Sequence, residues 1–312
     1  MKNTWKVSKS KIYFVIVLLG VFFISCGLED ILIVEAPTVV NNEPLYESED
    51  YLTLYFDFET NEKSDNFSGT DIYYKIYNSS EDLKRERDYI NTLSSSSNNN
   101  SNSSTAFQKL TGDKNSSNYF YQKLSLCYYY NDEGHIYNKN YFIPSHGSNT
   151  RVYFRIKNHI DAVNPNFFAG VSYPHKVDSE MSRYDGSYIH FLCYRKSTGK
   201  IQFCDWIEKE DKWIDCITDT EIHKSDLVLV EPGRYNGCSF DFFDEDDKKN
   251  PSFFKIPENG DDDFLYSSSP DEEDTFFVQF FAVGVVWDAD NIKSVYSIPL
   301  DLGSVQIKKG QL

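Results

Sequence analysis

The sequence predicts an all-β chain whose strands pair in antiparallel fashion. Short runs of residues alternate between apolar and polar side chains, the pattern of half-buried strands. Turn-forming residues separate several neighbouring runs, as expected of hairpins. No long amphipathic helices alternate with these runs, which argues against a parallel α/β sheet. We therefore expect mainly β-structure with one short helix.

The first 26 residues have the composition of an export signal. Residues 1–11 carry four lysines and no acidic residue, and residues 12–24 are apolar except for Gly20. A basic start, a short apolar core and small residues before the cleavage site define a secretory signal. The apolar run has 13 residues, whereas roughly 20 are needed to span a bilayer. Residues 1–25 are therefore predicted to be a signal peptide.

The end of this segment, Phe23-Ile24-Ser25-Cys26, resembles a lipobox. The usual leucine at its first position is phenylalanine here, as in the looser motif of spirochaetal lipoproteins, whose richness in Asn, Lys, Tyr and Ser the chain shares. The resemblance implies lipid on the Cys26 thiol and cleavage before it. Residues 26–49 would then tether the protein to the cell envelope, at the outer membrane and exposed on the surface. An ordinary cleaved signal with an incidental cysteine is the alternative.

The mature chain is strongly acidic. Removing residues 1–25 takes away four lysines and no acids, so the formal charge moves from −17 to −21. Nucleic acid is thereby disfavoured as a partner, because its binding depends on Lys and Arg facing phosphates. Blocks of like charge are usually solvated loops, and cation binding is the alternative function. The acids cluster at Asp241, Asp244–Asp247, Asp261–Asp263 and Asp271–Asp274.

The first predicted elements follow the tether. Residues 35–40 are expected to form an edge strand, a place where Pro37 is tolerated. Alternation of apolar and polar side chains then predicts strands at Leu52–Phe58 and Ile72–Tyr77. Serines followed by Glu81 and Asp82 predict the start of a helix near Ser80. It leads into Ser94–Ser104, a Ser/Asn tract too polar to offset its ordering entropy, which is expected to stay unstructured.

The remaining apolar runs predict a series of strands. They are Tyr119–Tyr130, Tyr141–Ile143, Val152–Lys157, Ile189–Arg195, Ile201–Trp206, Trp213–Ile217, Leu227–Val230, Cys238–Phe243, Phe276–Val286 and Val295–Ile307.

The two ends of the mature chain resemble parts of a fibronectin type III sandwich. Leu52–Phe58 and Ile72–Tyr77 look like its second and third strands. Phe276–Val283 and Val295–Leu300 look like its last two, with the Ser-x-Pro that precedes the final strand. The resemblance implies an antiparallel β-sandwich formed by both ends of the chain, with a large, mainly β insertion. Two sequential β domains are the alternative.

This resemblance divides the chain into five parts. They are the signal peptide (1–25), the lipidated tether (26–49), the sandwich (50–79 plus 272–309), a helix and Ser/Asn linker (80–117) and an inserted β-rich domain (118–271).

Five cysteines follow Cys26, an odd number that allows at most two disulfides. If Thr198-Gly199 is a two-residue hairpin loop, Cys193 lies directly opposite Cys204. Directly opposed residues have close Cβ atoms, so a disulfide between these two is one interpretation. The favoured alternative is that both are buried thiols that act as small apolar residues.

No catalytic motif, cofactor motif or metal-ligand spacing is present, and the six histidines are scattered. We therefore expect no catalytic residue, no cofactor and no metal. Trp213 follows a charged turn and is the candidate for an exposed ligand contact, while Trp206 is expected in the core. Tyr128–Tyr130 offers a second aromatic group.

Three functions remain open for the mature chain. The first is a non-enzymatic, adhesin-like surface lipoprotein that binds an unidentified protein through loops on a rigid scaffold. The second is a structural lipoprotein of the envelope that faces the periplasm. The third is a carbohydrate-binding β-sandwich. In each case the membrane partner is reached through the N-terminal lipid.

Overall fold

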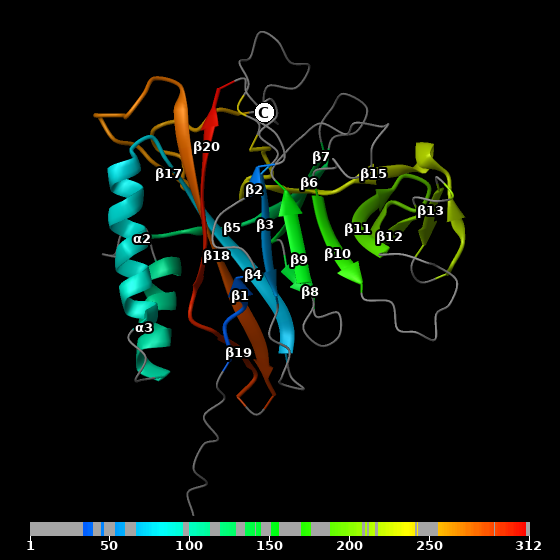
Figure 1. Cartoon of the computed structure of the whole chain (residues 1–312), viewed down its shortest axis with the longest axis horizontal. Coiled ribbons are helices and arrows are strands. Elements are labelled where there is room, and N and C mark those ends of the chain that lie inside the picture. The colour runs from blue at the N-terminus through cyan, green and yellow to red at the C-terminus, as the bar shows by residue number, and fades with distance from the viewer. Residues whose placement is uncertain are drawn as a thin grey trace, which may run out of the picture. The chain divides into compact units, whose positions relative to one another are not determined.

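Strands dominate the described part of the chain, and all of it belongs to one contact unit, Val34–Leu312. The structure is a computed structural model (Figure 1). It describes residues 34–39, 45–46, 54–59, 67–95, 100–112, 119–128, 135–140, 142–144, 151–155, 170–175, 188–207, 210, 212–215, 218–240, 242, 255–289 and 291–309. The mostly β character confirms the predicted class.

The strands fall into three sheets. In chain order they are β1 Thr38–Val39, β2 Leu45–Tyr46, β3 Leu54–Glu59, β4 Phe67–Tyr77, β5 Gln122–Lys123, β6 Ser125–Tyr128, β7 His135–Asn140, β8 Phe142–Pro144, β9 Arg151–Arg155, β10 Gly170–His175, β11 Tyr188–Arg195, β12 Lys200–Ile207, β13 Lys212–Asp215, β14 Glu221–Ile222, β15 Leu227–Leu229, β16 Glu231–Gly233, β17 Phe264–Leu265, β18 Thr275–Asp288, β19 Lys293–Tyr296 and β20 Leu300–Lys308. The helices are α2 Ser80–Ser95, α3 Asn100–Thr111 and the short 3-10 helix η3 Lys224–Asp226.

A seven-stranded sheet joins segments from both ends of the described chain. Its order is β17-β4-β18-β19, with β5 and β8 also pairing with β4 and β20 pairing with β18. The long central pair is antiparallel and runs from Phe277 opposite Tyr77 to Val286 opposite Phe67. Strands distant in sequence are thus hydrogen-bonded neighbours. The sequence predicts strands at Ile72–Tyr77 and Phe276–Val286, but not that they pair with each other.

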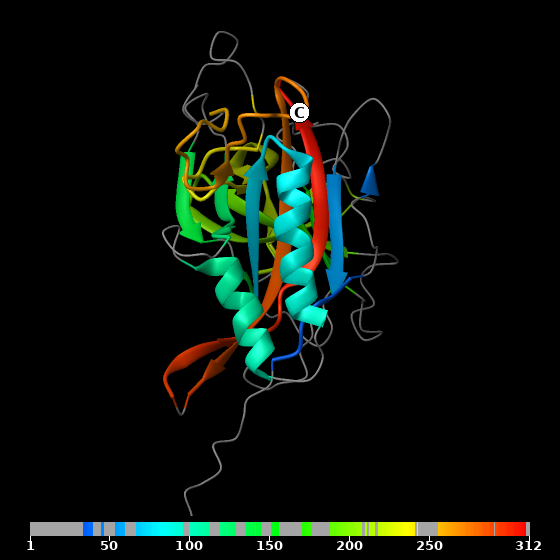
Figure 2. The ribbon, with the colours of Figure 1, turned by 90° about the vertical axis from the view of Figure 1, so that its left-hand side faces the viewer.

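Both faces of this sheet are buried. On one face, apolar residues of β4, β18 and β20 form a cluster with Val230, Phe240 and Phe242. On the other face, Tyr73, Tyr77 and other rings pack against the helices. Figure 2 shows the two helices side by side over this second face. Burial on both faces explains why β4 carries aromatic side chains at both alternating sets of positions.

Helix α2 begins where the sequence predicts. Ser79 is its N-cap: the side-chain oxygen accepts a hydrogen bond from the backbone N–H of Asp82 at 3.3 Å. Leu83 and Ile90 bury its apolar side against the sheet. Asn91 also reaches the sheet, donating to the Asp301 carboxylate at 2.6 Å. The predicted helix is therefore confirmed, together with its start.

The expectation that the whole Ser/Asn tract lacks structure is wrong, because helix α3 begins at Asn100 within it. The reason lies in the second half of the helix, where Ala106 and Leu110 are fully buried. Phe107 also stacks on Tyr296, with ring centroids 4.2 Å apart. This packing offsets the ordering entropy, and the helix extends backwards into polar residues. The described residues thus contain two α-helices where one was predicted.

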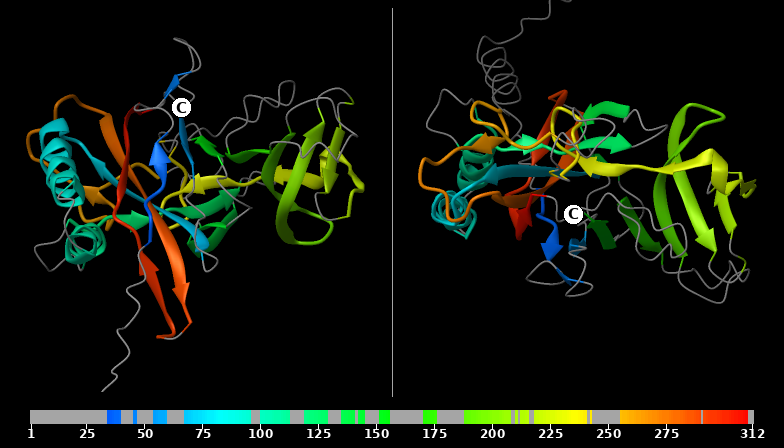
Figure 3. Two further views of the ribbon diagram at one scale, coloured as in Figure 1. Left: turned by 60° about the horizontal axis from the view of Figure 1, so that its bottom comes forward. Right: turned by 90° about the horizontal axis from the view of Figure 1, so that it is seen from above.

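A ten-stranded antiparallel sheet contains the predicted cysteine hairpin. Its order is β1-β3-β9-β10-β11-β12-β13-β14, with β2 pairing with β3 and β15 pairing with β11. A third sheet of three strands has the order β16-β6-β7. Figure 3 gives two further views of these sheets.

The predicted register of the β11–β12 hairpin is wrong by two residues. The loop is the four-residue turn 196–199, closed by Arg195 opposite Lys200. Asp226 fixes this longer loop: it accepts hydrogen bonds from the Ser197 N–H at 2.7 Å and from the Ser197 hydroxyl at 2.6 Å. Burial opposes ionisation of Asp226, but the bonds from Ser197 and Arg195 outweigh it and lower its pKa.

Several other strand predictions need correction. The run Val295–Ile307 is two strands, β19 and β20, which both pair with β18. Pro299 lies between them and has no N–H to donate, so it interrupts the pairing with β18. The run Tyr119–Tyr130 is divided between β5 and β6, which lie in different sheets. Described residues of the run Cys238–Phe243 form no strand. β7 and β10 were not predicted.

Candidate functional site

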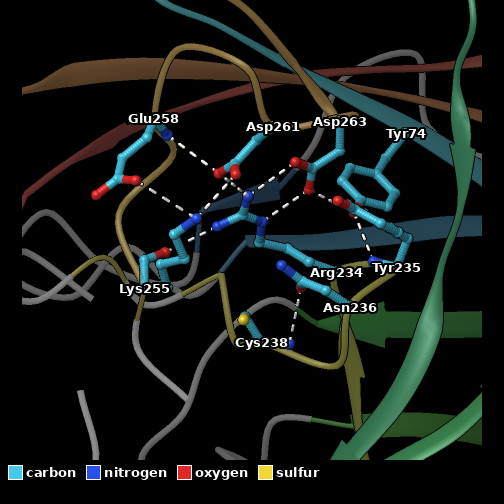
Figure 4. Close-up of polar contacts among 9 residues, drawn as sticks. All are labelled: Tyr74, Arg234, Tyr235, Asn236, Cys238, Lys255, Glu258, Asp261 and Asp263. Carbon is cyan, nitrogen blue, oxygen red and sulfur yellow. Dashed lines mark hydrogen bonds and ion pairs between the residues drawn. The ribbon is translucent and has the colours of Figure 1, made fainter. Parts of the chain in front are cut away.

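A buried cluster of charged side chains surrounds Arg234, which directly follows β16. Arg234 stands at the start of a tight turn: its N–H donates to the Cys238 carbonyl at 2.7 Å, and its carbonyl accepts from the Gly237 N–H at 2.7 Å. Gly237 has a φ of +80°, which favours glycine. The turn directs the Arg234 side chain, fully excluded from solvent, towards the loop 255–263 (Figure 4).

The Arg234 guanidinium is held mainly by Asp263. Nε donates to Oδ2 and Nη2 donates to Oδ1, both at 2.7 Å, in a bidentate pair. Nη2 also donates to Asp261 Oδ2 at 3.0 Å, and Nη1 donates to the Lys255 carbonyl at 2.8 Å. Four of the five guanidinium N–H groups therefore have acceptors in the protein.

The cluster also connects to the central sheet. The Tyr74 hydroxyl on β4 donates to Asp263 Oδ2 at 2.7 Å and accepts a hydrogen bond from the Tyr235 N–H at 2.7 Å. The Asp263 carbonyl accepts from the Ile76 N–H at 2.8 Å. At the solvent side, Lys255 Nζ lies 2.8 Å from Asp261 Oδ1 and 3.6 Å from Glu258 Oε2. The cluster thereby links three segments that are distant in sequence: β4, the turn at Arg234 and the loop 255–263.

Electrostatics fix the protonation states in this cluster. Burial by itself lowers the pKa of Arg234, but the Asp263 carboxylate outweighs it and raises that pKa further above its usual range. Burial opposes ionisation of Asp261, yet hydrogen bonds led by Lys255 hold its pKa below the usual value. Burial raises the pKa of the Tyr74 phenol and of the Cys238 thiol. These shifts favour the charged form of Asp261 and the protonated forms of the Tyr74 phenol and the Cys238 thiol.

This arrangement corrects the interpretation of the acidic block Asp261–Asp263. Asp263 is fully buried and Asp261 is partly buried, so the block is not a solvated loop. Both carboxylates accept hydrogen bonds from cationic side chains of the chain itself. No local sequence signal pairs Arg234 with this block, since the partners are 27 and 29 residues apart. The acidic block Asp271–Asp274 is exposed, as expected of a solvated loop.

A second buried cluster lies between β4 and α2. Lys75 Nζ is 2.9 Å from Glu86 Oε2, and the Tyr77 hydroxyl donates to the same oxygen at 2.8 Å. The Tyr121 hydroxyl lies 2.8 Å from that of Tyr77. Burial lowers the pKa of Lys75 despite Glu86, and raises the pKa of both tyrosines. As in the first cluster, the buried polar groups form hydrogen bonds and ion pairs with one another.

The disulfide that one interpretation of the hairpin allowed is absent from the structure. Cys193 lies opposite Gln202, and Cys204 lies opposite Phe191, so the two cysteines are diagonal neighbours. Both are buried thiols outside any disulfide, in a cluster with Trp213 and Ile222. The favoured alternative, in which both thiols act as small apolar side chains, agrees with this arrangement.

The expected exposure of Trp213 is also wrong: only 4% of its side-chain surface is accessible. β13 is flanked by β12 and β14, with Trp213 opposite Trp206 and Ile222. The ring packs in the same cluster as the two cysteines, so it offers no face to a glycan. Cys26 and the side chains of Trp206 and Tyr128–Tyr130 lie outside the described part.

The exposed large apolar side chains lie elsewhere, and sequence patterns did not single them out. Trp287 is 45% exposed and Ile292 is 77% exposed, both on the hairpin formed by β18 and β19. Tyr266 is 50% exposed in the loop before β18, and Tyr89 is 43% exposed on α2. Aromatic side chains of this kind are enriched at binding surfaces. They are the candidate contact residues of the described surface.

Within the described residues, no group of three or more His, Cys, Asp or Glu side chains is arranged to hold a metal ion. None of the helices described is both long and apolar enough to cross a bilayer. No protein-family model, no curated protein and no solved structure matches the chain.

Proposed function

We propose that the chain is a lipoprotein of a bacterial cell envelope, anchored by lipid on Cys26, whose mature part is a non-enzymatic protein-interaction module at the cell surface. The observation that carries the proposal is the lipobox-like Phe23-Ile24-Ser25-Cys26 after a basic and apolar leader. Stable membrane attachment needs more than one acyl chain, which the lipoprotein modification provides.

The loop before β18 supports a protein-binding role. Tyr266 is half exposed, and the acidic residues Asp271–Asp274 that follow it are exposed as well. Buried contacts hold the base of this loop: Asn78 donates to the Ser267 carbonyl at 2.8 Å and accepts from the Ser267 N–H at 2.7 Å. A rigid base under an aromatic and acidic loop suits a partner with a basic surface.

Two measurements on cells test the anchor and the surface location. Metabolic labelling with a radioactive fatty acid should mark the wild type and not Cys26→Ala. Protease added to intact cells should digest the protein. Survival until the envelope is opened would exclude surface display and favour the periplasm-facing structural role. Absence of label on the wild type would exclude the anchor.

The partner can be sought by photo-crosslinking from defined positions. A photoreactive amino acid at Tyr266 should form adducts with a second protein, and high salt should weaken them because the loop is acidic. The same amino acid at Ile292, on the β18–β19 hairpin, is the matched control and should give no such adduct. Equal adducts from both positions, or none from position 266, would contradict a partner at this loop.

We also propose the finer architecture, a fibronectin type III-like sandwich. β4, β18 and β20 pair in the order of the third, penultimate and last strands of such a fold, which supports the proposal. β3 lies in a different sheet, as the second strand of that fold does. Cleavage between α2 and α3 should leave both fragments associated, because β4 remains paired with β18. Independently folded halves would contradict it.

A further inference from the structure

The β18–β19 hairpin extends past the described residues of the neighbouring strands β4 and β20. The last pair that β18 forms with β4 is Val286 with Phe67, and β20 leaves β18 at Ala282. Beyond these points Trp287 and Asp288 pair with Ser294 and Lys293 of β19. Figure 2 and the left panel of Figure 3 show the hairpin, in orange and red, projecting from the sheet.

The tip of this hairpin carries two exposed large apolar side chains beside polar residues. Trp287 and Ile292 are the exposed large apolar residues at the tip. Asp288 accepts hydrogen bonds from the Asn291 N–H at 3.1 Å and from its side-chain amide at 2.9 Å. Ile292 has a φ of +52°, a conformation that costs free energy for a β-branched residue. The turn therefore keeps the Ile292 side chain exposed to solvent, although the backbone conformation of this residue is strained.

The N-terminal tether reaches the body at the base of the same hairpin. A Cβ placed on Gly284 would lie 3.0 Å from the Glu35 carbonyl oxygen, so the tether backbone packs directly on β18. Figure 1 shows residues 34–39, in dark blue, running away from the hairpin end of the sheet. The described part of the tether therefore begins beside β18, at the base of the hairpin.

Chain length places the lipid within reach of this tip. Cys26 precedes Val34 by eight residues, which can span at most about 28 Å at about 3.5 Å per residue. Gly284 precedes Asp288 by four residues, a rise of about 13 Å along a strand at about 3.3 Å per residue. A bilayer that holds the lipid of Cys26 is therefore close enough to meet the tip.

We propose that the tip of the β18–β19 hairpin, with Trp287 and Ile292, is a second membrane contact that inserts into the interface of the bilayer holding the lipid anchor. The inference rests on the proposed lipidation of Cys26. Tryptophan favours the membrane–water interface, where its ring is shielded and its N–H stays hydrated. The turn carries Asp288 and Asp290 against Lys293, so we expect no attraction to anionic lipid and binding that does not require it.

This contact orients the whole body. β18 runs from the loop with Tyr266 to the tip, and its 14 residues at about 3.3 Å each separate the two by about 46 Å. With the tip at the bilayer, the loop points away from it. A second contact beside the lipid thus presents the proposed protein-binding loop to the outside.

Quenching by brominated lipid tests the contact. The full-length lipidated protein is reconstituted into phosphatidylcholine vesicles with or without bromine on the acyl chains. Bromine should quench the fluorescence of Trp287, so wild type should lose more emission than Trp287→Phe. The loss should not depend on salt. Equal quenching of the wild type and Trp287→Phe overturns the proposal.

A matched control places the same probe at the other end of β18. The double variant Trp287→Phe, Tyr266→Trp should show no quenching beyond that of Trp287→Phe alone, and strong quenching at position 266 overturns the orientation. If Trp287 is shielded from aqueous iodide but not quenched by brominated lipid, a protein or a second copy covers the tip, which also overturns the proposal.

Flotation of the same vesicles separates this proposal from the anchor. If the wild type floats with the vesicles and Cys26→Ala does not, the lipid anchor stands, and quenching alone decides the hairpin contact. If the purified wild type carries no lipid and does not float, the proposed anchor fails and the hairpin contact that rests on it fails as well.

Discussion

Arg234 and Asp263 form a bidentate ion pair, with both Arg234 N–Asp263 O distances at 2.7 Å and both side chains fully shielded from water. A buried pair of this kind does not by itself add much stability, because desolvation of both ions opposes their attraction. Removal of one partner is nevertheless costly, because the remaining charge is buried without a counter-ion and without water. The pair therefore acts as a constraint that holds the loop 255–263 on the sheet.

Asp263→Asn should lower the free energy of unfolding by about 3–5 kcal/mol, because it leaves the Arg234 guanidinium buried without its main counter-ion. Urea denaturation followed by circular dichroism measures the change. Glu258→Gln is the matched control in the same cluster: its side chain is 72% exposed, and exposed pairs contribute about 0–1 kcal/mol. Equal effects of the two variants would show that the buried pair is not a constraint.

The buried tyrosines predict loss of stability at high pH. Burial raises the pKa of Tyr74, Tyr77 and Tyr121 well above the usual 10.0, so the folded state keeps protons that the unfolded state releases. The unfolding free energy must then fall as pH rises above 10. Lys75 acts in the opposite direction, because its lowered pKa makes stability rise with pH below 10.5.

Above pH 10.5 the contribution of Lys75 is complete and that of the tyrosines dominates. Absorbance at the wavelength of ionised tyrosine should therefore rise in one step together with the loss of circular dichroism. Tyrosines that ionise fully while the fold is intact would contradict this assignment. Tyr121→Phe keeps the ring but removes one such phenol, and should reduce the dependence of stability on pH in this range.

The buried thiols predict a specific labelling pattern. Without reductant, Cys193 and Cys204 should react with an alkylating reagent only after the protein is unfolded, because both are buried and neither forms a disulfide. Peptide mass spectrometry reads each position separately. If either thiol becomes reactive only after reduction, a disulfide is present and the observed register is incorrect.

Local patterns predicted the elements whose cause is local. The start of α2 followed from Ser79 and the acids after it, β4 followed from its alternation, and β18 followed from its apolar run. The hairpin loop could not be predicted, because Asp226 lies outside the hairpin and selects the four-residue turn by bonding to Ser197. Helix α3 was not predicted for a similar reason: Phe107 gains its stabilising contact from Tyr296, at the other end of the chain.

The candidate sites were less accessible to sequence reasoning than the fold. Asp261 and Asp263 were visible only as part of an acidic block, since their partner Arg234 lies in an unremarkable turn. The exposure of Trp213 was misjudged because β14, which covers it, is only two residues long. Trp287 ends a long apolar strand, where a core position is the natural expectation. Its exposure depends on where β4 and β20 end.

Gly284→Ala should loosen the tether without breaking the sheet. The new Cβ would lie 3.0 Å from the Glu35 carbonyl oxygen and 3.4 Å from the Phe67 ring. Because a backbone oxygen cannot rotate away, residues 34–39 must shift, at a cost of about 1–3 kcal/mol. The hydrogen bond from the Gly284 N–H to Ser297 Oγ, 2.8 Å long, can persist, so β18 itself should stay in place.

Limited proteolysis checks this outcome by following cleavage near residues 34–39, which should become faster in Gly284→Ala. Glu35→Ala is the matched control, because it changes the exposed side chain at the same contact but keeps the backbone oxygen. Cleavage that is as slow in Gly284→Ala as in Glu35→Ala would mean that the tether does not depend on this close approach. Since the same contact holds the tether at the base of the β18–β19 hairpin, Gly284→Ala should also weaken the quenching of Trp287 by brominated lipid.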